Sequence, residues 1–224
     1  MSEVRFKRPD GKECSGFQVE PPGGRKAPGI VVIQEWWGVN DQIKGVAAQL
    51  AEAGYRALVP DLYRGKVTLA DAEAGHLMSG LDFLDAAKQD IRGAAQFLGQ
   101  GGDGAKVGVI GFCMGGALSI LTAVFTPEIH AVVDWYGVPP PEAGDTRKIR
   151  VPVQGHFALR DGFFPIATVD ALEERLQGAG VVHEFNRYDA HHAFGNEHGA
   201  NYDPQAKKLA WQRTLEFFAT HLRQ

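Results

Sequence analysis

Apolar runs without polar alternation recur along this chain, and stretches with helical periodicity lie between them. The clearest run is Gly29-Ile30-Val31-Val32-Ile33-Gln34, which is typical of a strand buried on both faces of a sheet. Strands are predicted at 29–34, 55–59, 106–110, 131–135, 151–155 and 183–188. Helices are predicted at 41–53, 83–98, 115–126, 165–177 and 204–221. Strands that alternate with helices predict an α/β fold, in which helices cover both faces of a mostly parallel central sheet.

Turn-forming residues set the predicted ends of these segments. Asp41 is expected to cap the helix that begins there, and Gly54 is expected to end it. The glycine-rich segment 99–104 predicts a loop. Nearer the N-terminus, one or two short strands are expected around Phe17 and Val19. No repeat or linker divides the chain, so we expect a single domain that spans all 224 residues.

The charge balance and the apolar runs exclude several classes of partner. The chain has 23 Lys and Arg against 27 Asp and Glu, which gives a net charge of −4, whereas non-specific nucleic-acid binding needs a basic surface. No apolar run approaches the ~18 residues of a membrane span, and the N-terminus lacks the apolar core of a signal peptide. Two cysteines are too few for a disulfide framework. We therefore expect a cytoplasmic protein that binds neither nucleic acid nor membranes.

The strongest chemical signal is the segment Gly111-Phe112-Cys113-Met114-Gly115-Gly116, between a predicted strand and a predicted helix. It has the spacing G-x-S-x-G of a nucleophile elbow, with cysteine in place of serine. Glycines two residues to either side allow the tight turn that exposes the central side chain above the sheet. The helix N-terminus at this point favours the thiolate form of Cys113. The alternative is a buried structural cysteine, since free cysteines often lie in cores.

A nucleophile needs a base, and the base needs a group that orients it. His191 and His192 both lie between the last predicted strand and the last helix, where a histidine following nucleophile and acid belongs. Position alone does not separate these two histidines. Asp161 is the first carboxylate after the strand predicted at 151–155. Because ligands bind beyond the carboxyl ends of parallel strands, Cys113, Asp161 and one of the histidines are expected to meet there.

Glu35 ends the first buried strand and is followed by two tryptophans. A carboxylate in such a place is partly desolvated, which raises its pKa. We expect it either to support the loop or to hydrogen-bond the thiol as a switch. The backbone N–H groups of Trp36 and Met114 are placed to donate to an oxyanion.

In these residues the chain resembles the dienelactone hydrolase family of the α/β-hydrolase fold, from about Gly29 to the C-terminus. Several ordered motifs carry the resemblance: Gln34-Glu35-Trp36-Trp37-Gly38-Val39-Asn40, Pro60-Asp61-Leu62-Tyr63-Arg64-Gly65, Gly108-Val109-Ile110-Gly111-Phe112-Cys113-Met114-Gly115-Gly116, Gln154-Gly155-His156-Phe157, His192-Ala193-Phe194 and Ala210-Trp211-Gln212-Arg213-Thr214-Leu215-Glu216-Phe217-Phe218. The fold implied is an α/β-hydrolase domain over 1–224. The reaction implied is hydrolysis of an enol-lactone to maleylacetate.

The resemblance also assigns residues. The family's H-x-F pattern selects His192 over His191 as the base, with Cys113 as nucleophile and Asp161 as its partner. It implies that Glu35 holds or deprotonates the thiol when substrate arrives. It implies further that Arg64 binds a substrate carboxylate. The family's second arginine is missing from the segment after His192, so other lactones or esters are also candidate substrates. No metal or cofactor is implied, and the partner expected is a small-molecule lactone or ester bound by a monomer or small homo-oligomer.

Four alternatives compete with this interpretation. A glutamine amidotransferase also carries a cysteine elbow, but it pairs histidine with an acid two residues on, and no histidine here has one. A general carboxylesterase, or a non-catalytic binding module on the same fold, stays open because fold does not determine function. A metal site from His191, His192 and His198 lacks the spacing of a zinc site.

Overall fold

The strands of the protein form a single mixed sheet. The computed structural model describes residues 1–22, 24–101 and 105–223. Within them the sheet has eight strands in the order β1-β2-β4-β3-β5-β6-β7-β8. The strands are β1 (Ser2–Lys7), β2 (Glu13–Val19), β3 (Gly29–Ile33), β4 (Arg56–Pro60), β5 (Val107–Phe112), β6 (Ala131–Trp135), β7 (Val153–Arg160) and β8 (His183–His191). Strands β3 to β8 pair in parallel, whereas β1 and β2 form an antiparallel hairpin that joins β4.

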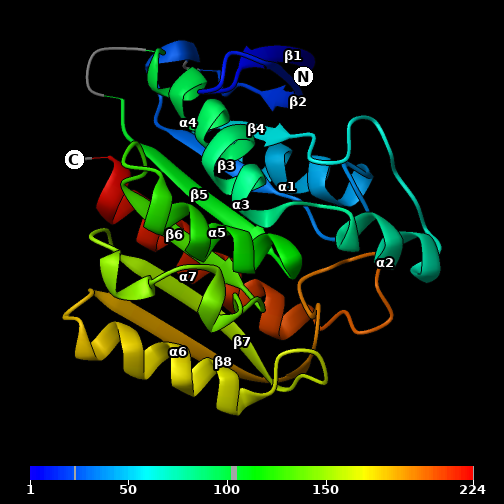
Figure 1. Cartoon of the computed structure of the whole chain (residues 1–224), viewed down its shortest axis with the longest axis vertical. Coiled ribbons are helices and arrows are strands. Elements are labelled where there is room, and N and C mark those ends of the chain that lie inside the picture. The colour runs from blue at the N-terminus through cyan, green and yellow to red at the C-terminus, as the bar shows by residue number, and fades with distance from the viewer. Residues whose placement is uncertain (23, 102–104, 224) are drawn as a thin grey trace.

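Helices cover both faces of this sheet, so the prediction of an α/β fold with a mostly parallel sheet is confirmed. The helices are α1 (Asp41–Glu52), α2 (Asp71–Ser79), α3 (Phe83–Asp85), α4 (Arg92–Gly99), α5 (Met114–Phe125), α6 (Ile166–Gly178) and α7 (Pro204–Leu222). A π-helical turn, η2 (Ala86–Ile91), joins α3 to α4, and three short 3₁₀ turns lie at Gly24–Lys26, Pro141–Ala143 and Thr146–Lys148. Figure 1 shows α4 and α5 in front of β5, with α7 behind the sheet.

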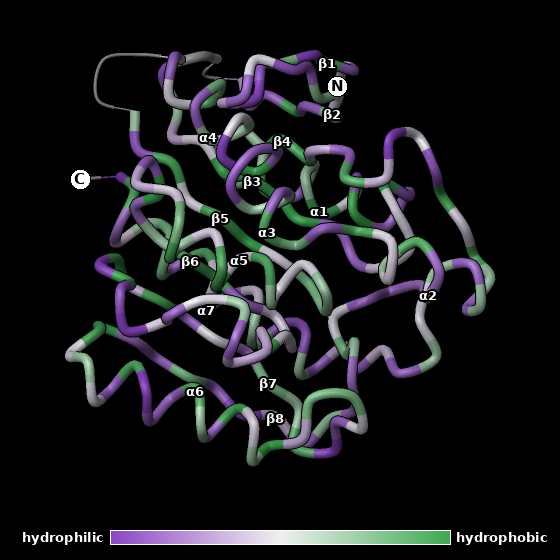
Figure 2. The backbone as a smooth tube through the Cα atoms, in the orientation of Figure 1, coloured by the Kyte–Doolittle hydropathy of each residue, from purple (hydrophilic) through white to green (hydrophobic). Residues whose placement is uncertain are grey.

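The core has two layers, one on each side of the sheet. One packs α4, α5 and α6 against the sheet, and the other packs α1 and α7 against the opposite face. The central strands β3 and β5 are buried on both faces, and their tubes are green in Figure 2. This burial explains why the sequence of β3 shows no polar alternation. No helix within the described residues combines the length and apolar character needed to cross a membrane.

The start of α1 differs from the sequence prediction. Asn40, not Asp41, is the N-cap, because Asn40 is extended and its side chain accepts the N–H of Ile43 at 3.1 Å. Asp41 occupies the first turn, where its negative charge complements the helix dipole. The predicted end is confirmed, since the chain leaves the helix through Gly54 at φ 91°.

The helix predicted at 83–98 is interrupted by the π-helical turn η2. Asp90 in this turn is 1% exposed and forms ion pairs with Arg8 and Arg64. These ion pairs tie the N-terminal hairpin and the segment after β4 to the turn. Helix α2 was not predicted, because it buries only Ala74 and so lacks an apolar face that a sequence pattern could reveal. Of the loop predicted at 99–104, residues 102–104 lie outside the described residues.

The last two strands are longer than predicted. Strand β7 continues to Arg160 rather than ending near Gly155, and β8 continues to His191. Both strands end in exposed residues, Leu159 and Arg160 in β7 and His191 in β8, so a run of buried apolar residues does not mark the end of either strand. As a result, Asp161 and His192 each follow directly on the end of a strand, at the same edge of the sheet.

Candidate active site

Cys113 occupies the sharp turn between β5 and α5. Its backbone has φ 56° and ψ −118°, a left-handed conformation that costs a non-glycine residue energy. A Cβ atom on Gly111 would lie 1.8 Å from the carbonyl oxygen of Gly115. A Cβ on Gly115 would lie 2.5 Å from the carbonyl oxygens of Ile33 and Gln34. The flanking glycines are therefore required by close backbone contact, and they let β5 turn tightly enough to expose the thiol.

The thiol begins an unbroken chain of hydrogen bonds. Cys113 Sγ lies 3.2 Å from His192 Nε2, and His192 Nδ1 lies 2.7 Å from Asp161 Oδ2. The other oxygen of Asp161 accepts the backbone N–H groups of Phe163 at 2.8 Å and Phe164 at 2.9 Å. When Nδ1 carries the ring proton and donates it in a hydrogen bond to the carboxylate, Nε2 is free to accept the thiol proton. Three residues from the ends of three different strands thus form a Cys–His–Asp arrangement.

His192 is held in place from several sides, while its neighbour His191 is exposed and ends β8. The backbone carbonyl of His192 accepts from Asn201 Nδ2 at 3.1 Å. The rings of Phe163, Phe164 and Tyr136 surround its imidazole, at centroid distances of 4.9, 5.7 and 5.3 Å. Packing of this kind fixes the ring in one rotamer, as a general base requires.

Glu35 lies directly beyond β3 and is 3% exposed. Its Oε1 accepts from Tyr136 Oη at 3.3 Å, and its Oε2 accepts from Asn196 Nδ2 at 2.7 Å. Burial raises the pKa of Glu35, and the bond from Asn196 partly offsets this rise. Among the described residues its hydrogen bonds run to Asn196, Tyr136 and Trp37 rather than to the thiol, which faces His192. The influence of Glu35 on the pKa of the thiol is therefore electrostatic.

Sequence reasoning missed Asn196 and Tyr136 as partners of Glu35. Asn196 follows His192 by four residues, and a polar side chain so close to a candidate base was the available signal. Tyr136 follows directly on β6, at the edge of the sheet where ligands bind. Its φ of 46° marks a second non-glycine residue in a left-handed conformation at this edge.

Burial raises the pKa of the Cys113 thiol, and the negative charge of Glu35 raises it further. The backbone N–H of Met114 acts in the opposite direction, and Asp161 adds to the rise. The sequence-based expectation that the helix N-terminus favours thiolate is thus outweighed, although the helix does contribute through Met114. This direction of shift favours the neutral thiol, whose proton can pass to His192 Nε2.

We expect Glu35→Gln to make Cys113 more reactive. A glutamine fits the same contacts, since its oxygen can accept from Asn196 and its NH₂ can donate to Tyr136 Oη. Removing the charge lowers the pKa of Cys113, and one pKa unit corresponds to about tenfold more thiolate at neutral pH. The measurement is the rate of iodoacetamide alkylation at Cys113, read by peptide mass spectrometry. The exposed variant Glu52→Gln is the matched control, and an unchanged or slower rate in Glu35→Gln would contradict this electrostatic role.

The backbone N–H groups of Met114 and Trp36 are the candidate oxyanion donors. The Met114 N–H bonds to the sulfur of Cys113. The Trp36 N–H has no hydrogen-bond acceptor among the residues that the structure describes. The loop of Trp36 is held by its contact with Trp37, at a ring distance of 5.0 Å, and by the bond from Thr68 N to Trp37 O at 3.1 Å. Two such donors can stabilise an oxyanion.

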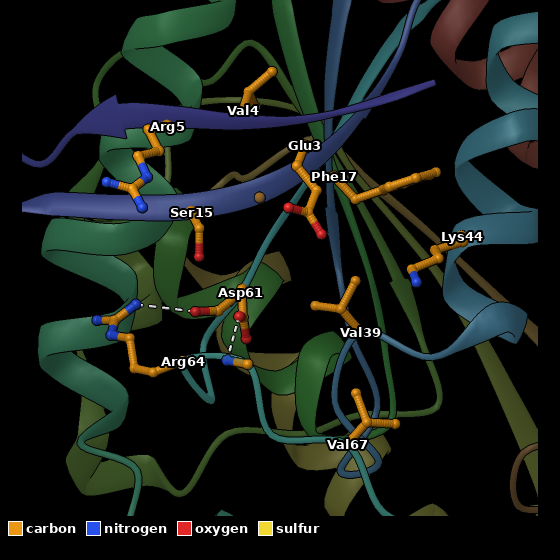
Figure 3. Close-up of a pocket in the computed structure, with 12 residues that line it drawn as sticks. Glu3, Val4, Arg5, Ser15, Phe17, Val39, Lys44, Asp61, Arg64 and Val67 are labelled. Atoms are coloured by element: carbon orange, nitrogen blue, oxygen red, sulfur yellow. Dashed lines mark hydrogen bonds between the residues drawn. The ribbon is translucent and has the colours of Figure 1, made fainter.

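The structure does not bring Arg64 to this arrangement. Its guanidinium bonds both oxygens of Asp90, at 2.8 and 2.9 Å, and also the carbonyl of Asp61 and the sulfur of Cys14. Figure 3 shows Arg64 in a hollow of about 590 Å³ beside the β1–β2 hairpin. None of Cys113, Asp161 and His192 lines that hollow. Cys14 is a buried free thiol, and burial raises its pKa to about 12.

The sequence profile of the dienelactone hydrolase family matches residues 14–222. The chain belongs to the dienelactone hydrolase family. It is 31% identical to the "Putative carboxymethylenebutenolidase" of Methylorubrum extorquens, over 96% of this chain and 79% of that protein. It is 33% identical to Protein usf of Aquifex pyrophilus, over 98% of each chain.

Solved structures of dienelactone hydrolases agree with this assignment. The "Putative Dienelactone Hydrolase" of Klebsiella pneumoniae superposes with a TM-score of 0.86 at 28% identity, over 98% of this chain and 99% of that chain. A dienelactone hydrolase-like promiscuous phosphotriesterase from metagenomic libraries gives a TM-score of 0.82 at 26% identity, over 98% of both chains. The protein described here therefore has the α/β-hydrolase fold and is a hydrolase of carboxylic esters or lactones.

Among the described residues, no group of three or more His, Cys, Asp or Glu side chains is arranged to hold a metal ion. His191 is exposed and His192 is committed to Asp161 and Cys113.

Proposed function

We propose that this protein hydrolyses lactones or activated carboxylic esters with Cys113 as nucleophile, His192 as general base and Asp161 as the group that orients His192. The observation that carries the proposal is the continuous hydrogen-bond chain from the strained elbow through His192 to Asp161. Each member stands at the end of a strand, where the fold binds ligands.

The first half of the reaction forms a thioester. Cys113 Sγ attacks the carbonyl carbon while His192 Nε2 takes the thiol proton. The Met114 and Trp36 N–H groups donate to the oxyanion of the tetrahedral intermediate. The C–O bond then breaks, and the leaving oxygen takes the proton from Nε2. Asp161 stabilises the imidazolium throughout, because its Oδ2 accepts from Nδ1.

The second half releases the acid. A water molecule gives one proton to His192 Nε2 as its oxygen adds to the thioester carbonyl. The C–S bond breaks, and the proton on Nε2 returns to the sulfur as the carboxylic acid leaves. The products are one acid and one alcohol or enol. For a lactone both groups belong to the same molecule.

Cysteine favours substrates with good leaving groups, because the thiolate is expelled from the tetrahedral intermediate more readily than an ordinary alkoxide. Enol and aryl esters satisfy this condition. The family resemblance and the relatives called carboxymethylenebutenolidase make a dienelactone, opened to maleylacetate, a substrate to test. This substrate carries a carboxylate, so its rate of turnover also tests how the site treats a negative charge.

The proposal predicts an acyl group on Cys113 during turnover. Wild-type protein is mixed with 4-nitrophenyl acetate or with dienelactone, quenched in acid within milliseconds and digested. We expect the acyl mass on the peptide that contains Cys113, together with a burst of 4-nitrophenolate for the acetate. Hydrolysis that persists after complete alkylation of Cys113, with no acylated peptide, would overturn the covalent scheme.

A further inference from the structure

We propose, on the basis of the function above, that the site selects esters without a negative charge near the reacting carbonyl, and that the exposed ring of Phe163 binds a flat apolar leaving group. The substrates expected are uncharged aryl or enol esters and lactones. Two independent features carry this inference, namely the charges around Cys113 and the surface beside His192.

Carboxyl groups surround the thiol. Asp161 is separated from Cys113 by one imidazole ring, through contacts of 2.7 and 3.2 Å. Glu35 is linked to Tyr136, whose ring lies 5.3 Å from that of His192. Three acids, Glu35, Asp161 and Asp134, raise the pKa of the Cys113 thiol, and burial raises the pKa of Asp134 itself. A carboxylate on the substrate would enter this field with its hydration removed, which like charges make unfavourable.

Three cations on the neighbouring segments, Arg64, Arg160 and Lys207, each have a carboxylate partner. Arg64 pairs with Asp90 at 2.8 Å and lies in the hollow shown in Figure 3. Arg160, directly before Asp161 in the sequence, pairs with Asp189 at 2.9 Å. The position that faces Glu35 from the loop after His192 holds Asn196, which is neutral.

Lys207 on α7, the cation next to that loop, completes the same pattern. It pairs with Glu197 at 2.8 Å. A substrate carboxylate would have to displace one of these partners to gain any of these three cations. Neutral esters avoid this cost, so the charge pattern favours them.

The second feature is the exposed aromatic ring beside the base. Phe163 is 69% exposed, although its ring centroid lies 4.9 Å from that of His192. Its backbone is fixed, since its N–H donates to Asp161 Oδ1 at 2.8 Å. The leaving oxygen must come within hydrogen-bond reach of His192 Nε2 to be protonated. The substituent on that oxygen therefore lies next to Phe163, and a flat apolar group there removes the ring from water.

The charge component is tested with a matched pair, methyl 4-acetoxybenzoate and 4-acetoxybenzoate. Both transfer an acetyl group from a phenol, and the para position prevents intramolecular attack by the carboxylate. Each kcat/KM is divided by the rate of alkaline hydrolysis of the same ester. We expect the neutral ester to be favoured by about tenfold or more. Equal or better use of the anionic ester would overturn the inference.

A variant links that preference to the carboxyl groups. Glu35→Gln is expected to narrow the ratio between the two esters, even where it lowers both rates, because it removes one of the charges. The exposed Glu52→Gln should leave the ratio unchanged. If the ratio of kcat/KM between the neutral and the anionic ester is the same in Glu35→Gln as in the wild type, Glu35 does not contribute to the charge preference. Failure of the covalent scheme would look different, since hydrolysis of both esters would then continue after alkylation of Cys113.

The aromatic component is tested with Phe163→Ala. We expect kcat/KM to fall about tenfold for methyl 4-acetoxybenzoate and to change less than about twofold for 2,2,2-trifluoroethyl acetate, an activated ester with a small leaving group. Alanine keeps the backbone N–H that donates to Asp161. Phe163→Tyr, which keeps an aromatic ring, should retain the wild-type kcat/KM for the aryl ester. The exposed Leu69→Ala is the control. Equal losses for both esters, or none for the aryl ester, would contradict a binding role for this ring.

Discussion

Cys113→Ala is expected to lower kcat/KM for aryl esters by about 10³-fold or more, because the protein then lacks the atom that attacks the carbonyl. The fold should survive, since the side chain is only partly buried and alanine adds no bulk to the turn. The measurement is steady-state hydrolysis of 4-nitrophenyl acetate, with thermal unfolding of both proteins as the check on folding. A folded variant that keeps wild-type activity would exclude Cys113 as the nucleophile.

The same experiment distinguishes a working unit from two separate contributions. His192→Gln is expected to be nearly as damaging as Cys113→Ala, because a neutral thiol needs Nε2 to take its proton. The double variant should lose no more than the worse single variant, since residues that act as a unit have non-additive effects. Multiplied losses would instead indicate that the two residues contribute through separate steps.

The fold follows closely from the apolar pattern. Strands β3 and β5 are buried on both faces, and their continuous apolar runs are typical of such strands. The α/β class could therefore be predicted from these runs. Elements with weak patterns were missed or truncated. Helix α2 has a single buried residue, and the ends of β7 and β8 alternate too irregularly to be recognised. Strands β7 and β8 are extended by hydrogen bonds to each other, which an apolar sequence pattern does not reveal.

The site divides in a similar way. Cys113, Asp161 and His192 are each marked by a strand end, and the structure brings all three within hydrogen-bond distance. Their catalytic roles remain proposals that the variants above test. The pKa of the thiol was harder to anticipate, because it depends on burial and on Glu35, which follows the neighbouring strand β3. Arg64 was assigned from resemblance alone, whereas its actual partner Asp90 lies in a π-helical turn that no pattern predicted.

Asp161→Asn is expected to lower kcat by about 10³- to 10⁴-fold while leaving the geometry almost unchanged, by analogy with the same change in the serine protease triad. Asp161 Oδ1 accepts two backbone N–H groups, from Phe163 and Phe164, so the amide oxygen of asparagine must take that place. The amide NH₂ then points at His192 Nδ1, where it donates a hydrogen bond instead of accepting one.

That reversal moves the imidazole proton to Nε2, which faces Cys113 and can no longer accept the thiol proton. A matched control is Asp82→Asn, because Asp82 Oδ1 also accepts two backbone N–H groups, at the start of α3, and has no histidine partner. Asp82→Asn should keep full activity. Equal loss in both variants would mean that Asp161 matters only for holding its loop. A loss confined to Asp161→Asn, with an unchanged melting temperature, would show that the carboxylate acts through the tautomer of His192.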